Sequence, residues 1–435
     1  MSLGTTIPYA GRSPRQPPAP EAYAACIGLD WADAKHDICL QAAGAERREF
    51  LVLEHRPEAI DAWVQTLRTW FHGQPVAVCL ELKKGPIVSA RRNYEFLVLF
   101  PVNPLTLARY REAFIPSRAK DDPSDAELQV ELLLKHRDKL KPLQPQSSAM
   151  RALTQLVEHR RRLVGDKVRC TNRLTSALKN YFPQVLQWFP DKDTAIFCDC
   201  LSRWPTLKAA QLARRSTLEG CFRAHHVPSV DVIAPRLQAV KRAMALTTDD
   251  GVIAPNVLLV QALVAQLRVT LQAIADVDTA MAQRAQDHPD FPLFDALPGA
   301  GAVFAPRLLV AFGEQRERFS SAEELQKYAG IAPVTERSGK KAWVHWRLQC
   351  PTFLRQTFVE WAAESTRPSF WAQVSYQHQR DKGKAHQAAV RALAFKWIRI
   401  LYRCWQDRTP YDESVYLQAL KRRSAPLLHT LAQEA

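Results

Sequence analysis

The sequence lacks three features that would place it in a membrane, secreted or ATP-hydrolysing class. It has no uninterrupted apolar run of transmembrane length, and no basic segment followed by an apolar one at its start. It also has no Gly-x4-Gly-Lys-Ser/Thr loop for binding a nucleoside triphosphate. We therefore expect a cytoplasmic protein that does not draw on ATP.

A disulfide framework is also missing. The nine cysteines are an odd number and several lie in apolar segments, which is typical of reduced core residues. One group of thiol and imidazole ligands deserves weighing: Cys198, Cys200, Cys221 and His225. Because Cys-x-Cys is not the usual spacing of a zinc knuckle, the sequence favours buried thiols and leaves a structural zinc site as the alternative.

Positive charge is in excess. The chain has 59 Lys and Arg residues against 44 Asp and Glu residues, a net charge of +15, and its pI is near 9.5. This balance favours a polyanionic partner. The length of 435 residues exceeds one ordinary hydrophobic core, so we expect two or three domains.

Four carboxylates have the spacing of a two-metal nuclease site. Asp30 and Glu81 each close a short apolar run that is typical of a buried strand, and Asp122 and Asp125 lie three positions apart where a helical pattern begins. Any one of them, taken alone, reads as a solvated cap. Together they offer clustered oxygen ligands for Mg²⁺, with Mn²⁺ as the alternative, and this chemistry points to phosphoryl transfer on nucleic acid.

The N-terminal region predicts a mixed sheet with helices on its faces. Residues 1–24 are rich in Pro, Ala and Arg and are predicted to form a disordered tail. The apolar pattern then predicts strands over 26–31, 37–42, 49–53, 76–82 and 96–102, and helices over 57–71 and 86–95. Asp33, Asp37 and Asp121 are interpreted as bystanders near the four acids.

Two long amphipathic helices follow. Apolar residues recur at steps of three, four or seven from Leu153 to Tyr181 and again from Val260 to Met281. The pattern fits a coiled coil within the chain, a coiled coil between chains, or two helices of a monomeric bundle. The opposite face of the first helix carries Arg160, Arg161 and Arg162, which we expect to bind nucleic-acid backbone.

The last region holds two turns and a basic helix. Residues 297–301 (Leu-Pro-Gly-Ala-Gly) resemble the turn of a helix–hairpin–helix, although a plain turn is the stronger reading. Ser338 stands in a glycine-bearing basic turn, from which its hydroxyl can reach a phosphate, but most such serines are ordinary turn residues. The helix over 386–405 interleaves basic and aromatic residues, which suits a nucleic-acid-facing helix.

These motifs, in this order, resemble the DEDD transposases of insertion sequences that use a bridge RNA, the family numbered one hundred and ten, with its eleven-eleven branch. The matched residues run from about 25 to 400: Gly28-Leu29-Asp30 with Lys35; Glu81 with Gly85-Pro86; Val102-Asn103-Pro104; Lys120-Asp121-Asp122 with Asp125-Ala126; residues 297–301; Phe319 with Tyr328-Ala329-Gly330 and Pro333; and Ser338-Gly339. Lys83 and Lys84 depart from the small residues expected after the Glu.

The resemblance implies the fold class and the domains. It implies an α/β RNase H-like (RuvC-like) N-terminal domain over 25–148, an α-helical coiled-coil and oligomerisation region with an insert over 149–288, and an all-α C-terminal transposase domain over 289–415. A C-terminal tail over 416–435 completes the chain.

The resemblance also implies the chemistry and the partners. Asp30, Glu81, Asp122 and Asp125 would be catalytic and hold Mg²⁺, and Ser338 would be the nucleophile that forms a covalent phosphoserine link to DNA. The partners would be a noncoding bridge RNA, donor and target double-stranded DNA, and further copies of the chain in a dimer or tetramer. Such a bacterial protein would be nucleoid-associated when active.

Two other functions stay open. A RuvC-like structure-specific nuclease would use the same acids with water as the nucleophile. A non-catalytic nucleic-acid-binding protein would keep the fold without the reaction, and the presence of all four acids disfavours it.

Overall fold

The computed structural model describes residues 23–81, 94–114, 122–144, 146–225, 230–339 and 341–422. The chain divides into two compact units, Met1–Pro145 and Gln146–Ala435. The predicted tail, apart from its last two residues, and the predicted helix near 86–95, apart from residues 94 and 95, lie outside the described residues.

The first unit is built on a five-stranded mixed sheet. Strand order is β3-β2-β1-β4-β5, with β1, β2 and β3 antiparallel and β4 and β5 parallel to β1. The strands are β1 (Ala25–Trp31), β2 (Lys35–Ala42), β3 (Glu49–Glu54), β4 (Val76–Leu80) and β5 (Leu97–Pro101). The five predicted strands are confirmed, with ends that differ by no more than two residues.

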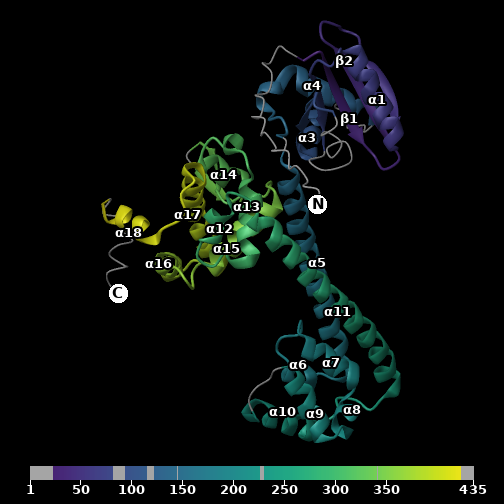
Figure 1. Ribbon diagram of the computed structural model, residues 1–435, viewed down its shortest axis with the longest axis vertical. Coiled ribbons are helices and arrows are strands. Elements are labelled where there is room, and N and C mark those ends of the chain that lie inside the picture. Colours follow the sequence, from purple (N-terminus) through teal and green to yellow (C-terminus); the bar gives the residue numbers. More distant parts are fainter. Residues whose placement is uncertain are drawn as a thin grey trace, which may run out of the picture. The chain divides into compact units, whose positions relative to one another are not determined.

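Helices cover both faces of this sheet (Figure 1). Strand residues alternate between the faces, so Ile27 and Val78 pack in the cluster that contains residues of α1 (Pro57–Trp70), while Cys26 and Ala77 pack in the cluster that contains residues of α4 (Asp122–His136). The short helix α3 (Pro104–Phe114) contacts α4. A 3-10 turn, η2 (Arg137–Lys139), directly follows α4. The predicted mixed sheet with helices on its faces is confirmed.

The second unit begins with the two long helices, α5 (Ser148–Tyr181) and α11 (Asp250–Gln286), which lie side by side (Figure 1). Their buried residues fall on the two predicted apolar stripes, and the Sγ of Cys170 on α5 lies 3.3 Å from the carbonyl oxygen of Leu263 on α11. The helices therefore pair with each other within one chain. Of the alternatives that the sequence left open, the structure supports pairing within the chain.

Helix α11 also changes one expectation. It contains an 18-residue window that is long and apolar enough to cross a membrane by length and composition, although the sequence had predicted no such segment. Two carboxylates stabilise α11 within the chain. Asp278 of α11 accepts a hydrogen bond from Arg160 of α5, and Asp249, directly before α11, caps its N-terminus. We interpret α11 as a core helix, because its apolar stripe is covered by α5.

Short helices form a body at each end of this pair. Helices between α5 and α11 pack in one cluster with the adjoining halves of both: α6 (Gln184–Trp188), α7 (Ala195–Arg203), α8 (Leu207–Leu212), α9 (Arg215–Ala224) and α10 (Val230–Arg242). Those after α11 pack around four fully buried tryptophans: α12 (Phe291–Asp295), α13 (Gly301–Phe312), η3 (Arg316–Arg318), α14 (Ala322–Tyr328), α15 (Thr352–Glu364), α16 (Phe370–Asp381) and α17 (His386–Asp407). The predicted aromatic inner face of α17 is confirmed by Trp397 and Trp405.

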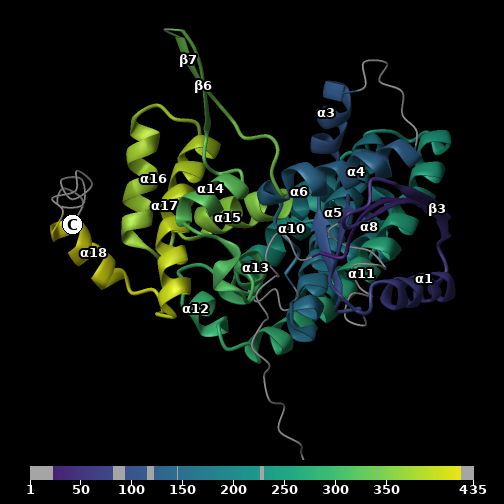
Figure 2. The ribbon, with the colours of Figure 1, turned by 90° about the horizontal axis from the view of Figure 1, so that it is seen from above.

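The predicted helical C-terminal domain is confirmed, but it is not all-α, because this body also carries a two-stranded antiparallel ribbon. Its strands are β6 (Val334–Ser338) and β7 (Lys341–His345), paired in register from Val334↔His345 to Ser338↔Lys341. The connection begins at Gly339, whose φ of 57° is typical of the first position of a two-residue hairpin turn. Figure 2 shows the ribbon projecting from the helices of its own body.

The last helix, α18 (Glu413–Arg422), runs across the boundary at 415 that the sequence predicted for the C-terminal tail. Residues 423–435 lie outside the described part of the chain.

Candidate active site

Asp30 and Glu81 lie next to each other at one edge of the sheet of the first unit. Strands β1 and β4 run parallel with Leu29 paired to Leu80; the next residue of β1 is Asp30, and Glu81 is the first residue after β4. Neighbouring strands are about 4.8 Å apart, and paired positions share a face. Both acids continue the alternation that directs Cys26 and Cys79 to the α4 side. The sheet register therefore brings two acids together that are 51 positions apart in the sequence.

A third acid, Asp37, belongs to the same row. The antiparallel pairing of β1 with β2 puts Asp37 directly opposite Asp30, and its side chain is buried. The interpretation of the sequence leaves Asp37 out as a bystander, but the structure places it beside Asp30 on the α4 face. The short connection between β1 and β2 was the available signal, because a tight hairpin sets which residues face each other.

Helix α4 lies directly against this row, and Gly28 makes the close approach possible. A Cβ at Gly28 would lie 1.9 Å from the carbonyl oxygen of Ala126, so only glycine fits. The backbone N–H of Leu29 also donates to Oε1 of Gln129 at 2.7 Å. These contacts place the first turn of α4, with its acids, against the strand that carries Asp30.

Asp125 is buried, and an arginine engages it. Only 3% of Asp125 is exposed, and Nε of Arg111 from α3 donates to its Oδ1 at 2.8 Å, with a second contact from Nη2. The pair offsets the cost of burying the carboxylate. Asp122 begins α4 three positions earlier, and its side chain lies outside the described residues.

The donor set suits a hard divalent cation, because Asp30, Glu81 and Asp125 offer only carboxylate oxygens. Over the described residues, however, no three His, Cys, Asp or Glu side chains are arranged to hold a metal ion. The ion pair with Arg111 gives one physical reason, because it holds Asp125 toward α3. The side chains fit a metal ion by the chemistry of their donor atoms, and Arg111 engages the carboxylate of Asp125.

Ser338, the predicted nucleophile, lies in the second unit. It is the last residue of β6, it is exposed, and the register puts it directly opposite Lys341. The sequence predicts a turn here; Ser338 itself is in a strand, and Gly339 after it is a turn residue. The hydroxyl is thus presented near the end of a ribbon that has no helix packed over it, which suits a group that reaches into a large substrate.

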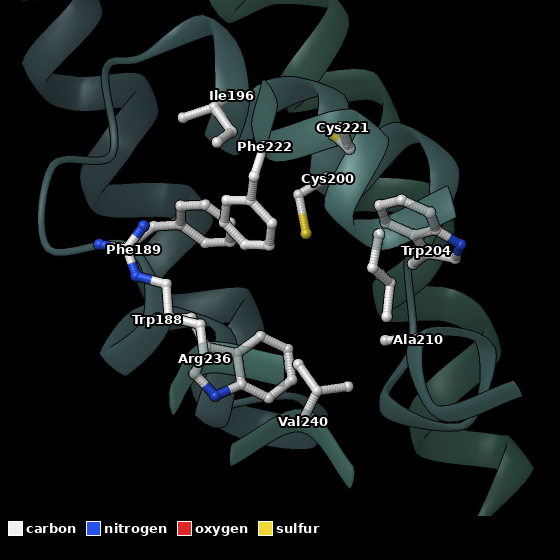
Figure 3. Close-up of a pocket in the computed structure, with 11 residues that line it drawn as sticks. Trp188, Phe189, Ile196, Cys200, Trp204, Ala210, Cys221, Phe222, Arg236 and Val240 are labelled. Carbon is white, nitrogen blue, oxygen red and sulfur yellow. The ribbon is translucent and has the colours of Figure 1, made fainter. Parts of the chain in front are cut away.

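The alternative of a structural zinc site at Cys198, Cys200, Cys221 and His225 receives no support. Among the described residues no metal-binding group is found, and Nε2 of His225 is instead 2.6 Å from Oδ2 of Asp199. Burial raises the pKa of the Cys198 thiol to about 11 and that of Cys200 to about 12, which keeps both protonated. Figure 3 shows Cys200 and Cys221 among aromatic side chains around an apolar cavity of about 20 Å³. They are buried thiols, as the sequence favoured.

The turn over residues 297–301 is a packing element. A Cβ at Gly299 would lie 2.8 Å from the carbonyl oxygen of Glu364 on α15, and Nε1 of Trp361 donates to the carbonyl oxygen of Pro298 at 3.1 Å. The plain-turn reading, which the sequence analysis preferred, accounts for this glycine.

The arginine cluster on α5 is occupied by ion pairs within the chain. Arg160 pairs with Asp278 of α11, and Arg161 pairs with Glu158 at 2.8 Å. Arg162 lies 3.9 Å from the same Glu158 carboxylate. These contacts favour a structural role in the helix pair over the predicted binding of nucleic acid.

Comparison with known proteins gives two matches to family models. The DEDD transposase model of IS110 elements matches residues 27–183, and the model of the IS116/IS110/IS902 transposase family matches residues 292–377. The first range contains the four acids and the second contains Ser338.

Relatives agree with these matches. The mini-circle transposase of IS117 from Streptomyces coelicolor is 29% identical over 428 residues, which cover 93% of this chain and 98% of that protein. An uncharacterized protein of insertion element IS110 from the same organism is 26% identical over 68% of this chain and 73% of its own length. The pilin gene-inverting protein of Moraxella bovis is 29% identical over 28% of this chain and 39% of its own length. The chain therefore belongs to the IS110 family of transposases.

Proposed function

We propose that this transposase is an RNA-guided, site-specific DNA recombinase that cuts and rejoins donor and target DNA through a covalent phosphoserine intermediate. The observation that carries the proposal is the group of acids at one end of the sheet beneath α4, where Asp30 of β1 and Glu81, directly after β4, both follow the paired position Leu29–Leu80. The strand order and directions, with α1 and α4 on opposite faces, support an RNase H-like first unit.

In the proposed reaction, Oγ of Ser338 attacks the phosphorus of a DNA phosphodiester. The new Oγ–P bond forms as the P–O3′ bond breaks, and the serine proton ends on the departing 3′ oxygen. The link keeps the energy of the phosphodiester, so that a 3′ hydroxyl of the other DNA can attack the phosphoserine and release Ser338. No ATP is required, in agreement with the absence of a nucleotide-binding loop.

The carboxylates Asp30, Glu81, Asp122 and Asp125 would hold Mg²⁺. Bound there, the ion would supply positive charge that stabilises the scissile phosphate and the leaving oxygen. Asp30 lies in β1 and Glu81 directly follows the paired end of β4, whereas Asp125 would exchange its contact with Arg111 for the ion. The acids and Ser338 act on one phosphate, from one subunit or from two.

A noncoding bridge RNA would select the two DNA sites by base pairing, as the family resemblance implies. The net charge of +15 supports binding of RNA and DNA backbones. The alternative is a structure-specific nuclease that uses water, and it is favoured by one observation: Ser338 and the acids lie in different units of the chain.

A covalent protein–DNA adduct tests the proposal. The protein is incubated with labelled element-end DNA, guide RNA and Mg²⁺ and is separated by denaturing electrophoresis. We expect a DNA-labelled protein band that is absent in Ser338→Ala, because alanine has no oxygen to form the bond.

Thr335→Val is the matched control, since Thr335 lies on the same strand but on the opposite face of the ribbon. It should keep the band. A band that persists in Ser338→Ala and disappears in Thr335→Val would move the nucleophile to Thr335. Cleavage without any covalent band would favour the nuclease.

We also propose that α11 joins copies of the chain into a dimer or tetramer. Its side away from the buried stripe exposes Leu258 and Val269, at 73% and 71% of their surface, and such an apolar patch is typical of an interface. Leu258→Asp should shift the protein to a smaller mass in light scattering, whereas Val168→Asp, at an exposed site of α5, should not. An unchanged mass in Leu258→Asp would place the interface elsewhere.

A further inference from the structure

We propose that the face of the β6–β7 ribbon that carries Ser338 is a DNA-strand binding surface. On this face Lys341 contacts a phosphate beside the serine, and Trp343 stacks on an unpaired base of the same strand. The inference deepens the proposed function and rests on it for the role of Ser338.

The ribbon register determines which residues share the face with Ser338. Directly paired residues project to the same side, and successive pairs alternate. Ser338 therefore shares its side with its partner Lys341 and, one step away from the tip, with the pair Glu336 and Trp343. The ion pair between Glu336 and His345, at 3.3 Å, agrees with this assignment, because both belong to that face.

Trp343 is exposed, as is Trp346 three positions later, in contrast to the tryptophans of the helices in this body. Four tryptophans of the surrounding helices are fully buried, whereas Trp343 is 45% exposed. Every other residue of its strand β7 is exposed as well. A two-stranded ribbon without a packed face is marginally stable by itself. A large ring kept on its surface is therefore better explained by a partner than by packing within the chain.

The charge of the ribbon selects the kind of partner. Arg337 and Lys341 are exposed near its tip, Lys340 lies between them in the sequence, and the carboxylate of Glu336 is already engaged by His345. The ribbon therefore attracts an anion.

A second cationic group lies where the ribbon returns to the helices. The guanidinium of Arg391 lies over the ring of Trp346, and two of its nitrogens are buried with no hydrogen-bond partner. Burial, and next the charge of Arg355, lower the pKa of Arg391. A phosphate beside this guanidinium would offset the repulsion between Arg391 and Arg355.

A single nucleic-acid strand matches this alternation of charge and ring. Aromatic side chains stack on unpaired bases, and nearby cations bind the backbone, in proteins that hold single strands. Strand exchange between two DNA duplexes exposes unpaired bases next to the cut phosphate. We commit to DNA rather than RNA because Ser338, on the same face, would react with DNA.

The test is the affinity of the full chain for a fluorescein-labelled single-stranded DNA of mixed sequence, measured by anisotropy at low and high salt. Trp343→Ala should weaken binding by about 5-fold or more, an effect that persists at high salt because stacking is not screened. Trp343→Phe should restore most of the affinity. Lys341→Gln should instead lower the slope of log K against log salt by about 0.7, as expected for one lost phosphate contact on a single strand.

Val344→Ala is the control, because Val344 is exposed on the opposite face of the same strand and should leave affinity unchanged. Thermal unfolding of each variant checks that the fold is intact. Equal affinity of Trp343→Ala and the unchanged protein would overturn the inference, as would tighter, Trp343-dependent binding to RNA of the same sequence.

Failure of this inference is distinguishable from failure of the proposed function. If the covalent band depends on Ser338 while Trp343→Ala binds DNA normally, the proposed function is supported and the proposed binding surface is contradicted. If no band forms while DNA binding still depends on Trp343, the binding surface is supported and the role of Ser338 as nucleophile is contradicted.

Discussion

The two candidate centres of this transposase differ in how the fold holds them. The acids lie at the edge of a five-stranded sheet, beneath a helix that contacts the strand backbone at Gly28. Ser338 lies at the end of a two-stranded ribbon whose strand residues are exposed, apart from the half-buried Val334. One centre is held by register and packing, and the other is held by one row of ribbon hydrogen bonds.

The difference corresponds to two kinds of work. Carboxylates that hold a cation must keep their mutual distances, and a packed sheet keeps them. A nucleophile that serves two DNA molecules must reach a large substrate, and an exposed ribbon can shift without disturbing a core. We infer that substitutions that disturb the packing of α4 on the strand lower the stability of the first unit, whereas substitutions on the ribbon leave the stability of the packed cores unchanged.

The largest expected effect is loss of cleavage at the sheet edge. Asp30→Asn and Glu81→Gln should lower Mg²⁺-dependent cleavage of element-end DNA on the order of 100-fold or more, because each removes a charge that would face the metal. Thermal stability should be kept or rise slightly, since neighbouring like charges repel. Glu58→Gln, at an exposed acid of α1, is the control. Full cleavage by Glu81→Gln would remove that residue from the site.

A pair of glycine substitutions tests the contrast in packing. Gly28→Ala should lower the free energy of unfolding by about 1–3 kcal/mol or more, because its Cβ meets a backbone carbonyl that cannot rotate away. Gly339→Ala meets nothing within 4 Å, and its cost at a φ of 57°, about 1–2 kcal/mol, is confined to the ribbon. Urea denaturation should therefore show a lower midpoint for Gly28→Ala alone. Equal midpoints would contradict the contrast.

The smallest expected effect concerns the cations. Arg160 is paired with Asp278, so Arg160→Ala should leave the salt dependence of DNA binding unchanged and cost about 1 kcal/mol of stability or less. Lys341→Gln on the ribbon should lower the slope of log K against log salt by about 0.7. A lower slope in Arg160→Ala would restore the predicted binding role of the α5 arginines.

The order of elements was readable from the sequence because it depends on local patterns. Alternating and continuous apolar runs predicted all five strands of the sheet, and the 3.6-residue period predicted both long helices. The short glycine-bearing segment around Ser338 was harder. A ribbon with polar residues on both faces carries no burial pattern, so its strands were predicted as a turn.

What the sequence determined by itself is the place of the four candidate acids near strand and helix ends and the family to which the chain belongs. Only the tertiary structure decided which groups meet: Asp37 beside Asp30, Arg111 on Asp125, and α11 paired with α5. The physical reason is the distance along the chain over which each signal acts. Periodicity reports the burial of each residue within its own element, whereas these contacts depend on register and helix placement between separate elements.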